Sequence, residues 1–131
     1  MVSAKEFLAK ENKCITLLGM SGVGKTHLAK LIGEEGGWFH FSGDYRIGAT
    51  HLKEEIISNI SNKMEANNWL KNLLDSNSIS INSQVSFDNL EPISTFLGKV
   101  GNPENGGLAF DEFVRRQHLF FEAEKKTMYE V

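Results

Sequence analysis

The chain has 131 residues, a formal net charge of −3 and a single cysteine, which limits it to one small domain and excludes an internal disulfide. With 40% hydrophobic and 24% charged residues, the composition is typical of a folded protein and excludes disorder throughout. No block of Lys and Arg indicates nucleic-acid binding, and no apolar stretch approaches the ~20 residues that span a bilayer. Charges interrupt the first residues, which excludes a secretory signal. We therefore expect a cytoplasmic protein.

The N-terminal third predicts strand, loop, helix and strand in that order. After a polar lead-in over residues 3–12, Cys14–Leu18 is a continuous apolar run, as in a strand buried on both faces, so we expect the Cys14 thiol to be buried and inert. An apolar stripe predicts a helix over Lys25–Glu35, ended by two glycines. The aromatic run Trp38–Phe41 predicts a second strand. The expected fold class is therefore α/β, a βαβ unit with a parallel sheet.

The remainder of the chain has mainly helical periodicity. Ser76–Ser86 is read as a loop in preference to an edge strand, and 98–107 as a turn-rich linker. The Phe-rich stripe of the last helix is expected to lie in the core. Helices are predicted at 49–65, 69–74 and 88–99 and from Phe110 onward. The organisation is then one domain over 1–131, with a phosphate-binding core at 13–48 and a mainly helical part at 49–131.

The decisive motif lies between the first strand and the first long helix. Residues 19–26, GMSGVGKT, match G-x-x-x-x-G-K-[ST] without a mismatch. Glycines let the backbone approach an anion closely, and successive N–H groups at a helix N-terminus bind it. Lys25 can reach the β- and γ-phosphates, and the Thr26 hydroxyl can ligate Mg²⁺. The alternative is a glycine turn that binds nothing. The predicted nucleotide-binding residues are Gly19, Ser21, Gly22, Val23, Gly24, Lys25, Thr26 and His27.

At these residues the chain resembles the P-loop nucleoside triphosphatase superfamily. GMSGVGKTHLAKLI is similar to the opening of its small-molecule kinases, such as gluconate, shikimate and nucleotide kinases, and to uncharacterised bacterial ATPases. WFHFSGDYRIG resembles the kinase pattern in which an acidic residue follows the second strand. The resemblance implies Asp44 as the base that orients or deprotonates an acceptor hydroxyl, and Arg46 as a contact to substrate or phosphate. It implies Lys25 as the third catalytic residue. Asp44 as a cap of a helix or turn is the alternative.

One departure from the superfamily pattern concerns the Walker B aspartate. The local candidate is Asp111-Glu112, but only three apolar residues precede these acids, so we prefer them in the first turn of a helix. Arg115 and Arg116 are expected on a solvated helix face, with a grip on phosphate as the minority interpretation. The four histidines, His27, His40, His51 and His118, show no ligand spacing, which makes a zinc site improbable.

The resemblance implies ATP and Mg²⁺ as cofactors. The expected function is ATP hydrolysis or phosphoryl transfer from Mg-ATP to a small hydroxylated acceptor, so the protein is expected to be an enzyme, an ATPase or a small-molecule kinase. The alternative is a nucleotide-dependent switch or binding module, which the missing Walker B favours. No nucleic acid or membrane partner is expected.

The count of confident strands bears on whether the domain is complete. In P-loop kinases a third strand inserts between the first two, and only Cys14–Leu18 and Trp38–Phe41 are confident strands here. Without that insertion their backbone groups would lack partners. We therefore expect the chain to be the N-terminal part of a longer protein, with Ile79–Val85 as a middle strand in the rival interpretation.

Overall fold

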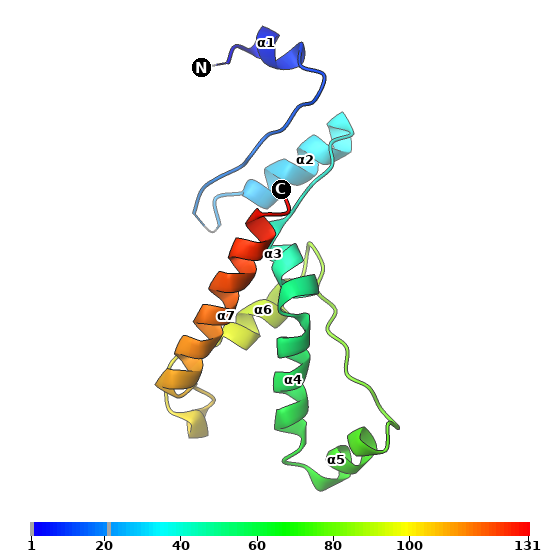
Figure 1. Cartoon of the computed structure of the whole chain (residues 1–131), viewed down its shortest axis with the longest axis vertical. Coiled ribbons are helices and arrows are strands. Elements are labelled where there is room, and N and C mark those ends of the chain that lie inside the picture. Colours follow the sequence, from blue (N-terminus) through cyan, green and yellow to red (C-terminus); the bar gives the residue numbers. More distant parts are fainter. Residues whose placement is uncertain (1, 21) are drawn as a thin grey trace. The chain divides into compact units, whose positions relative to one another are not determined.

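The structure, a computed structural model, describes residues 2–20 and 22–131 and consists of helices joined by irregular segments (Figure 1). It divides into two compact units, residues 1–40 and 41–131, which are described separately. The first unit contains α1 (Ala4–Leu8) and α2 (Lys25–Gly36). The second contains α3 (Gly43–Arg46), the π-helix η1 (Ile47–His51), α4 (Lys53–Met64), α5 (Asn68–Asp75), α6 (Glu91–Leu97), the 3₁₀ helix η2 (Pro103–Asn105) and α7 (Phe110–Met128).

The predicted parallel sheet is wrong. No residue in the described ranges belongs to a β-strand, and the only β-type pairs found there are two isolated bridges, Ser86 with Asn89 and Val100 with Leu108. Cys14–Leu18 is irregular, and Ile15, Leu18 and Cys14 itself are exposed. A strand needs hydrogen bonds from neighbouring strands. A short apolar run shows that burial would be favourable, but it does not supply the neighbour.

The second predicted strand, Trp38–Phe41, is likewise irregular in the structure, and Phe39 is exposed. Within the first unit the Trp38 ring stacks on Phe7, with ring centroids 6.2 Å apart. The aromatic run therefore supplies a side-chain contact and no ladder of backbone hydrogen bonds.

The prediction of α2 is confirmed. It spans Lys25–Gly36 and ends at Gly37, whose left-handed φ of 64° places its N–H on the carbonyl of Gly33. A residue with a side chain would be strained in that conformation, so the glycine at this position ends the helix where the sequence predicts. Also as predicted, 76–86 contains no strand or helix, apart from the bridge at Ser86.

The core of the second unit lies between η1, α4, α6 and α7. Its buried hydrophobic side chains come from all four elements: Ile47, Leu52, Ile56, Ile93, Phe96 and Ala123. Of the apolar residues that recur at every fourth position here, Leu52 and Ile56 are buried and Ile60 is exposed. Gly48 in η1 has no side chain because α6 packs directly on it: a Cβ there would lie 2.5 Å from Ile93 Cδ1.

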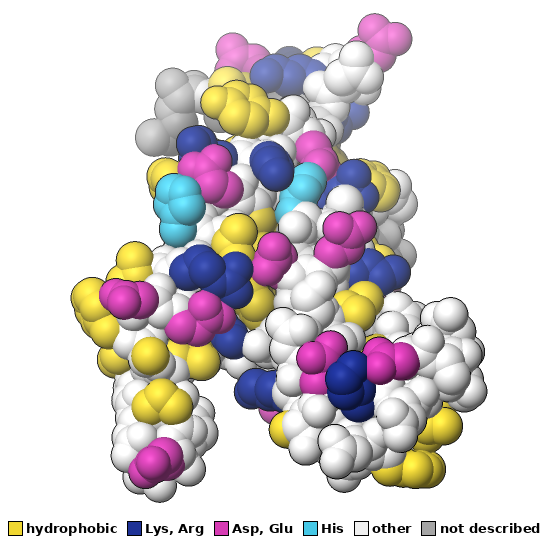
Figure 2. Space-filling view, turned by 60° about the horizontal axis from the view of Figure 1, so that its bottom comes forward, with side chains coloured by type: hydrophobic (Ala, Val, Ile, Leu, Met, Phe, Trp, Pro, Cys, Tyr) yellow, Lys and Arg dark blue, Asp and Glu magenta, His cyan; other side chains and the backbone are white. Residues whose placement is uncertain are grey.

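Surface charges of both signs are interspersed. On the face shown in Figure 2, Lys and Arg side chains lie beside Asp and Glu, with hydrophobic side chains reaching the surface between them. Such a mixed surface agrees with the small net charge. No helix within the described residues is both long and apolar enough to cross a membrane.

Candidate functional site

The glycine loop leads into the N-terminal end of α2. Gly24 is the residue that precedes this helix, with a left-handed φ of 89°, and no side chain among the described residues caps the first turn. The first turn also contains no acidic residue. The first N–H groups of a helix have no partner inside it, and the helix dipole makes this end positive. The end of α2 therefore presents donors and partial positive charge that suit an anion.

Two glycines of the loop need their lack of a side chain. Gly22 and Gly24 have φ values of 81° and 89°, in the region where L-residues are strained. A Cβ at either position would meet no heavy atom within 4 Å. The space beside both residues is therefore open, and it is the backbone conformation that requires glycine here.

The Lys25 side chain folds back onto the loop in this structure. Its Nζ donates hydrogen bonds to the carbonyl oxygens of Gly19 and Met20, at 2.7 and 2.6 Å. The ammonium is thus held beside the loop, where it can exchange these neutral acceptors for the oxygens of a phosphate. A phosphate oxygen carries negative charge, so it attracts the ammonium more strongly than a neutral carbonyl oxygen does.

A cavity of about 390 Å³ lies beside the loop. Its lining combines the loop and the start of α2 with the segment that precedes the loop: Thr16, Leu17, Leu18, Val23, Gly24, Lys25 and Leu28. The volume is in the range of small-molecule sites, which typically combine apolar walls with a few polar groups. Here the polar groups are the Lys25 ammonium, the Thr16 side chain and the backbone.

Thr26 and His27 lie in the first turn of α2 and are exposed. The Thr26 hydroxyl is therefore open to a ligand, as its predicted role with Mg²⁺ requires. Ser21, which the motif also implicates, lies outside the described residues. Together, the uncapped helix end, the open glycines and Lys25 fit a phosphate chain, and Thr26 offers a hydroxyl where its predicted role with Mg²⁺ needs one.

Asp44 and Arg46 belong to the second unit. Ser42, and not Asp44, is the cap of α3, since its hydroxyl accepts from the N–H of Tyr45 at 3.3 Å. Asp44 is exposed in the first turn of α3, and its role as a base stays a prediction. Arg46 is engaged with the Glu130 carboxylate, which also lies 2.9 Å from His51 Nε2. Arg46 and then His51 lower the pKa of Glu130.

Asp111 and Glu112 lie in the first turn of α7, as predicted. The Glu112 carboxylate accepts from Arg115 at 2.8 Å and from Arg116 at 2.7 Å. These bonds, Arg115 first, lower the pKa of Glu112 to about 2. Glu112 is therefore committed to arginine and is not available to hold Mg²⁺ in the manner of Walker B.

The prediction that Arg116 lies on a solvated face is wrong. Arg116 is only 4% exposed. Its guanidinium donates to the carbonyl of Phe96 and to Asn59 Oδ1, and lies 4.9 Å from the centre of the Phe96 ring. The signal in the sequence is spacing: Arg116 precedes the buried Ala123 and Thr127 by seven and eleven residues, on the same helical face.

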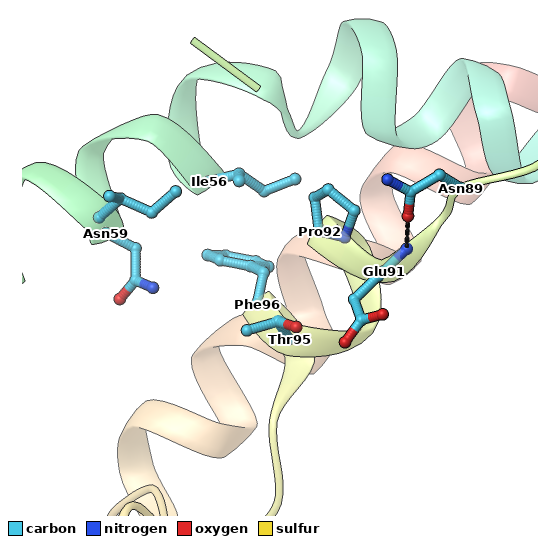
Figure 3. A pocket seen from close by; sticks show the side chains of 8 residues that line it. Ile56, Asn59, Asn89, Glu91, Pro92, Thr95 and Phe96 are labelled. Atoms are coloured by element: carbon cyan, nitrogen blue, oxygen red, sulfur yellow. Dashed lines mark hydrogen bonds between the residues drawn. The ribbon is translucent and has the colours of Figure 1, made fainter. Parts of the chain in front are cut away.

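A second cavity, of about 380 Å³, lies between α4 and α6 in the second unit (Figure 3). Ile56 and Phe96 come from the buried core, and Asn59, Asn89 and Glu91 add polar groups. Asn89 is fixed by a hydrogen bond from the N–H of Glu91, at 3.2 Å. Among the residues described as lining this cavity, Glu91 alone is ionisable, so the lining provides no acid–base pair.

In the described part of the chain, no three His, Cys, Asp or Glu side chains are grouped to hold a metal. Comparison of the chain with family models, with curated proteins and with solved structures gave no match. The loop and the N-terminal end of α2 are therefore the features of this chain that indicate a function.

Proposed function

We propose that residues 19–26 and the first turn of α2 bind the phosphates of Mg-ATP. The observation that carries the proposal is the conjunction at one place of the complete motif, a helix N-terminus that no described side chain caps and an ammonium that donates to loop carbonyls. None of these features depends on the sheet that the sequence predicted and the structure lacks. Each is a property of the loop and of the helix that follows it.

The proposed reaction is hydrolysis of ATP or transfer of its terminal phosphoryl group to a small hydroxylated acceptor. Backbone N–H groups from Gly22 to Thr26 orient the phosphates, and Lys25 leaves the carbonyls of the loop to neutralise their charge. The Thr26 hydroxyl is the chain's ligand for Mg²⁺, which when bound supplies further charge neutralisation. Asp44 is proposed as the base for the acceptor hydroxyl, with Arg46 as a contact to acceptor or phosphate.

A second candidate is a nucleotide-dependent switch with little catalysis. It is favoured by one observation: Glu112, beside the Walker B candidate Asp111, is bonded to two arginines. A site that lacks a second metal ligand can still bind a nucleotide and order a surface, but it stabilises the transition state for transfer poorly.

Titration calorimetry with Mg-ATP, Mg-ADP, AMP and inorganic triphosphate tests the binding proposal. We expect one site per chain that takes ATP and triphosphate, binds AMP much more weakly and weakens with added salt. Equal affinity for AMP and ATP contradicts a phosphate-binding loop. A phosphate-release assay, with and without a panel of sugars and nucleosides, then separates the two candidates: turnover supports the enzyme, and binding without turnover supports the switch.

A further inference from the structure

The outer face of α7 is apolar and uncovered. We define it as Phe110, Val114, Gln117, Phe121, Glu124 and Met128, all of which are exposed. Its four hydrophobic members are 68%, 47%, 52% and 76% exposed in chain order. The inner face of the same helix, which includes Arg116, Phe120 and Ala123, packs on the core. The outer face is thus a second stripe that the fold of unit 41–131 does not use.

The spacing of the outer face is that of a coiled-coil seam. Its members are separated alternately by four and three residues, from 110 to 128. A stripe with this alternation stays on one side of a helix and packs against a similar stripe by knobs-into-holes contacts. Two of its six positions, Gln117 and Glu124, are occupied by polar residues, which leave the spacing of the stripe unchanged.

Charges beside the seam select one orientation for a second copy. Asp111, His118 and Lys125 follow one flank of the outer face at intervals of seven residues, and all three are exposed. In an antiparallel pair of α7 helices, Asp111 faces the partner's Lys125, and symmetry repeats the contact. In a parallel pair, this flank lies opposite the partner's other flank, Phe113, Phe120 and Thr127, which carries no charge. Only the antiparallel pair brings opposite charges together across the seam, so the charges favour it.

We propose that the protein forms a homodimer in which two α7 helices pack antiparallel through their outer faces. Such a pair is isologous, because the same stripe is used on both chains, and it closes at two copies. From the side-chain exposures, the four hydrophobic residues would bury about 400–500 Å² per chain, an area below that of stable interfaces and in the range of weak, transient ones. The dimer is therefore weak and concentration-dependent. Dimerisation through α7 does not depend on nucleotide binding.

Sedimentation equilibrium of the full chain tests the apolar seam. The mass should rise from 14.7 kDa toward twice that value as the protein concentration increases through the micromolar range. Phe121→Glu should hold the mass at the monomer, whereas the control Trp69→Glu, on the exposed side of α5, should leave the dimer intact. A monomer at every concentration, unlimited growth beyond the dimer, or a dimer unchanged by Phe121→Glu overturns the proposal. The proposal is also overturned if the protein is a monomer in which residues 1–40 protect the amides of the outer face from hydrogen exchange.

Exchange of the charges at Asp111 and Lys125 tests the antiparallel orientation of the two helices. It leaves the hydrophobic residues of the outer face unchanged. Lys125→Glu should weaken dimerisation by about tenfold, because it replaces two weak attractions by repulsions. Asp111→Lys should have a similar effect, and the double variant should restore the wild-type dissociation constant. Lys126→Glu is the matched control: it makes the same charge change one position off the flank and should have little effect. Failure of the double variant to restore affinity, with each single variant folded by circular dichroism, contradicts the antiparallel pair.

Discussion

Gly48→Ala tests the packing of η1 against α6, on which the core of the second unit depends. Gly48 is buried within the π-helix. A Cβ at this position would lie 2.5 and 2.6 Å from Ile93 Cδ1 and Cγ1, and 3.1 Å from Val85 Cγ1. The first two distances are far below van der Waals contact, and Ile93 is itself fully buried among core residues. The added methyl group therefore has no free space to occupy.

Two effects of the substitution oppose each other. Alanine is the better helix former, by about 1 kcal/mol relative to glycine. Inserting a methyl group into a packed core costs typically about 1–3 kcal/mol. Because the clash involves a buried side chain and not the end of an exposed one, we expect the cost to prevail, with a net destabilisation of up to about 2 kcal/mol. The sign is thus set by the contact between η1 and α6.

Hydrogen exchange of the α4 and α6 amides measures the free energy of opening of this unit. Ile93→Val removes the Cδ1 methyl that the new Cβ would meet, so the double variant should be more stable than the sum of the two single effects. Gly101→Ala is the matched control, since its Cβ would make an ordinary 3.6 Å contact with Gly107. If Gly48→Ala raises stability, helix propensity alone governs the site and the described packing is refuted.

Three further changes give separate tests. Arg116→Met should destabilise the second unit by about 3 kcal/mol in chemical denaturation, because it leaves the Phe96 carbonyl and Asn59 Oδ1 without their donor; an unchanged midpoint contradicts the buried network. The pKa of Glu112 in the folded protein, about 2, lies below its value of 4.5 in the unfolded chain. The ionised carboxylate therefore stabilises the fold above about pH 4.5, and this stabilisation is lost as the pH falls toward 2. Partial exposure limits the stabilisation to about 1–2 kcal/mol, and Glu112→Gln should flatten the pH dependence of the free energy of unfolding. Asp44→Asn should lower turnover ~10²-fold in a phosphate-release assay without weakening ATP binding; full turnover excludes Asp44 as the base.

The helices could be predicted where local signals determine them. The stop of α2 at Gly37 depends on a left-handed residue, and the acids in the first turn of α7 fit the helix dipole. Such features lie within a few residues of one another, so the sequence displays them directly. The open glycines of the loop belong to the same class, and their conformation agrees with the motif.

The errors came from properties that depend on residues far apart in the chain. Cys14–Leu18 has the composition of a buried strand, but a strand forms only beside another strand, and composition does not show whether one is present. Arg116 was assigned to solvent because charged side chains are rarely buried. It is buried because Asn59 and the Phe96 carbonyl, 57 and 20 residues away, provide acceptors.

The Phe-rich helix shows a third kind of error. The sequence predicts one apolar stripe in the core, but the helix carries two: Phe120 packs on the core, while Phe110 and Phe121 are exposed. The two stripes lie about 100° apart on the helix, which is the rotation between consecutive residues. A count of apolar residues in a window therefore does not separate them. Only the packing of the neighbouring helices decides which stripe is buried.

Calorimetric titration of Lys25→Ala with Mg-ATP tests most directly whether the glycine loop is the nucleotide site. Lys25 provides the ammonium at the loop, and the loss of a hydrogen bond to a charged group, about 1.5–3 kcal/mol, weakens binding by about 10–100-fold. Lys13→Ala, an exposed lysine outside the motif, controls for the change in net charge and should bind as the wild type does. Equal affinity of Lys25→Ala and the wild type for Mg-ATP would show that the nucleotide, if bound, lies elsewhere.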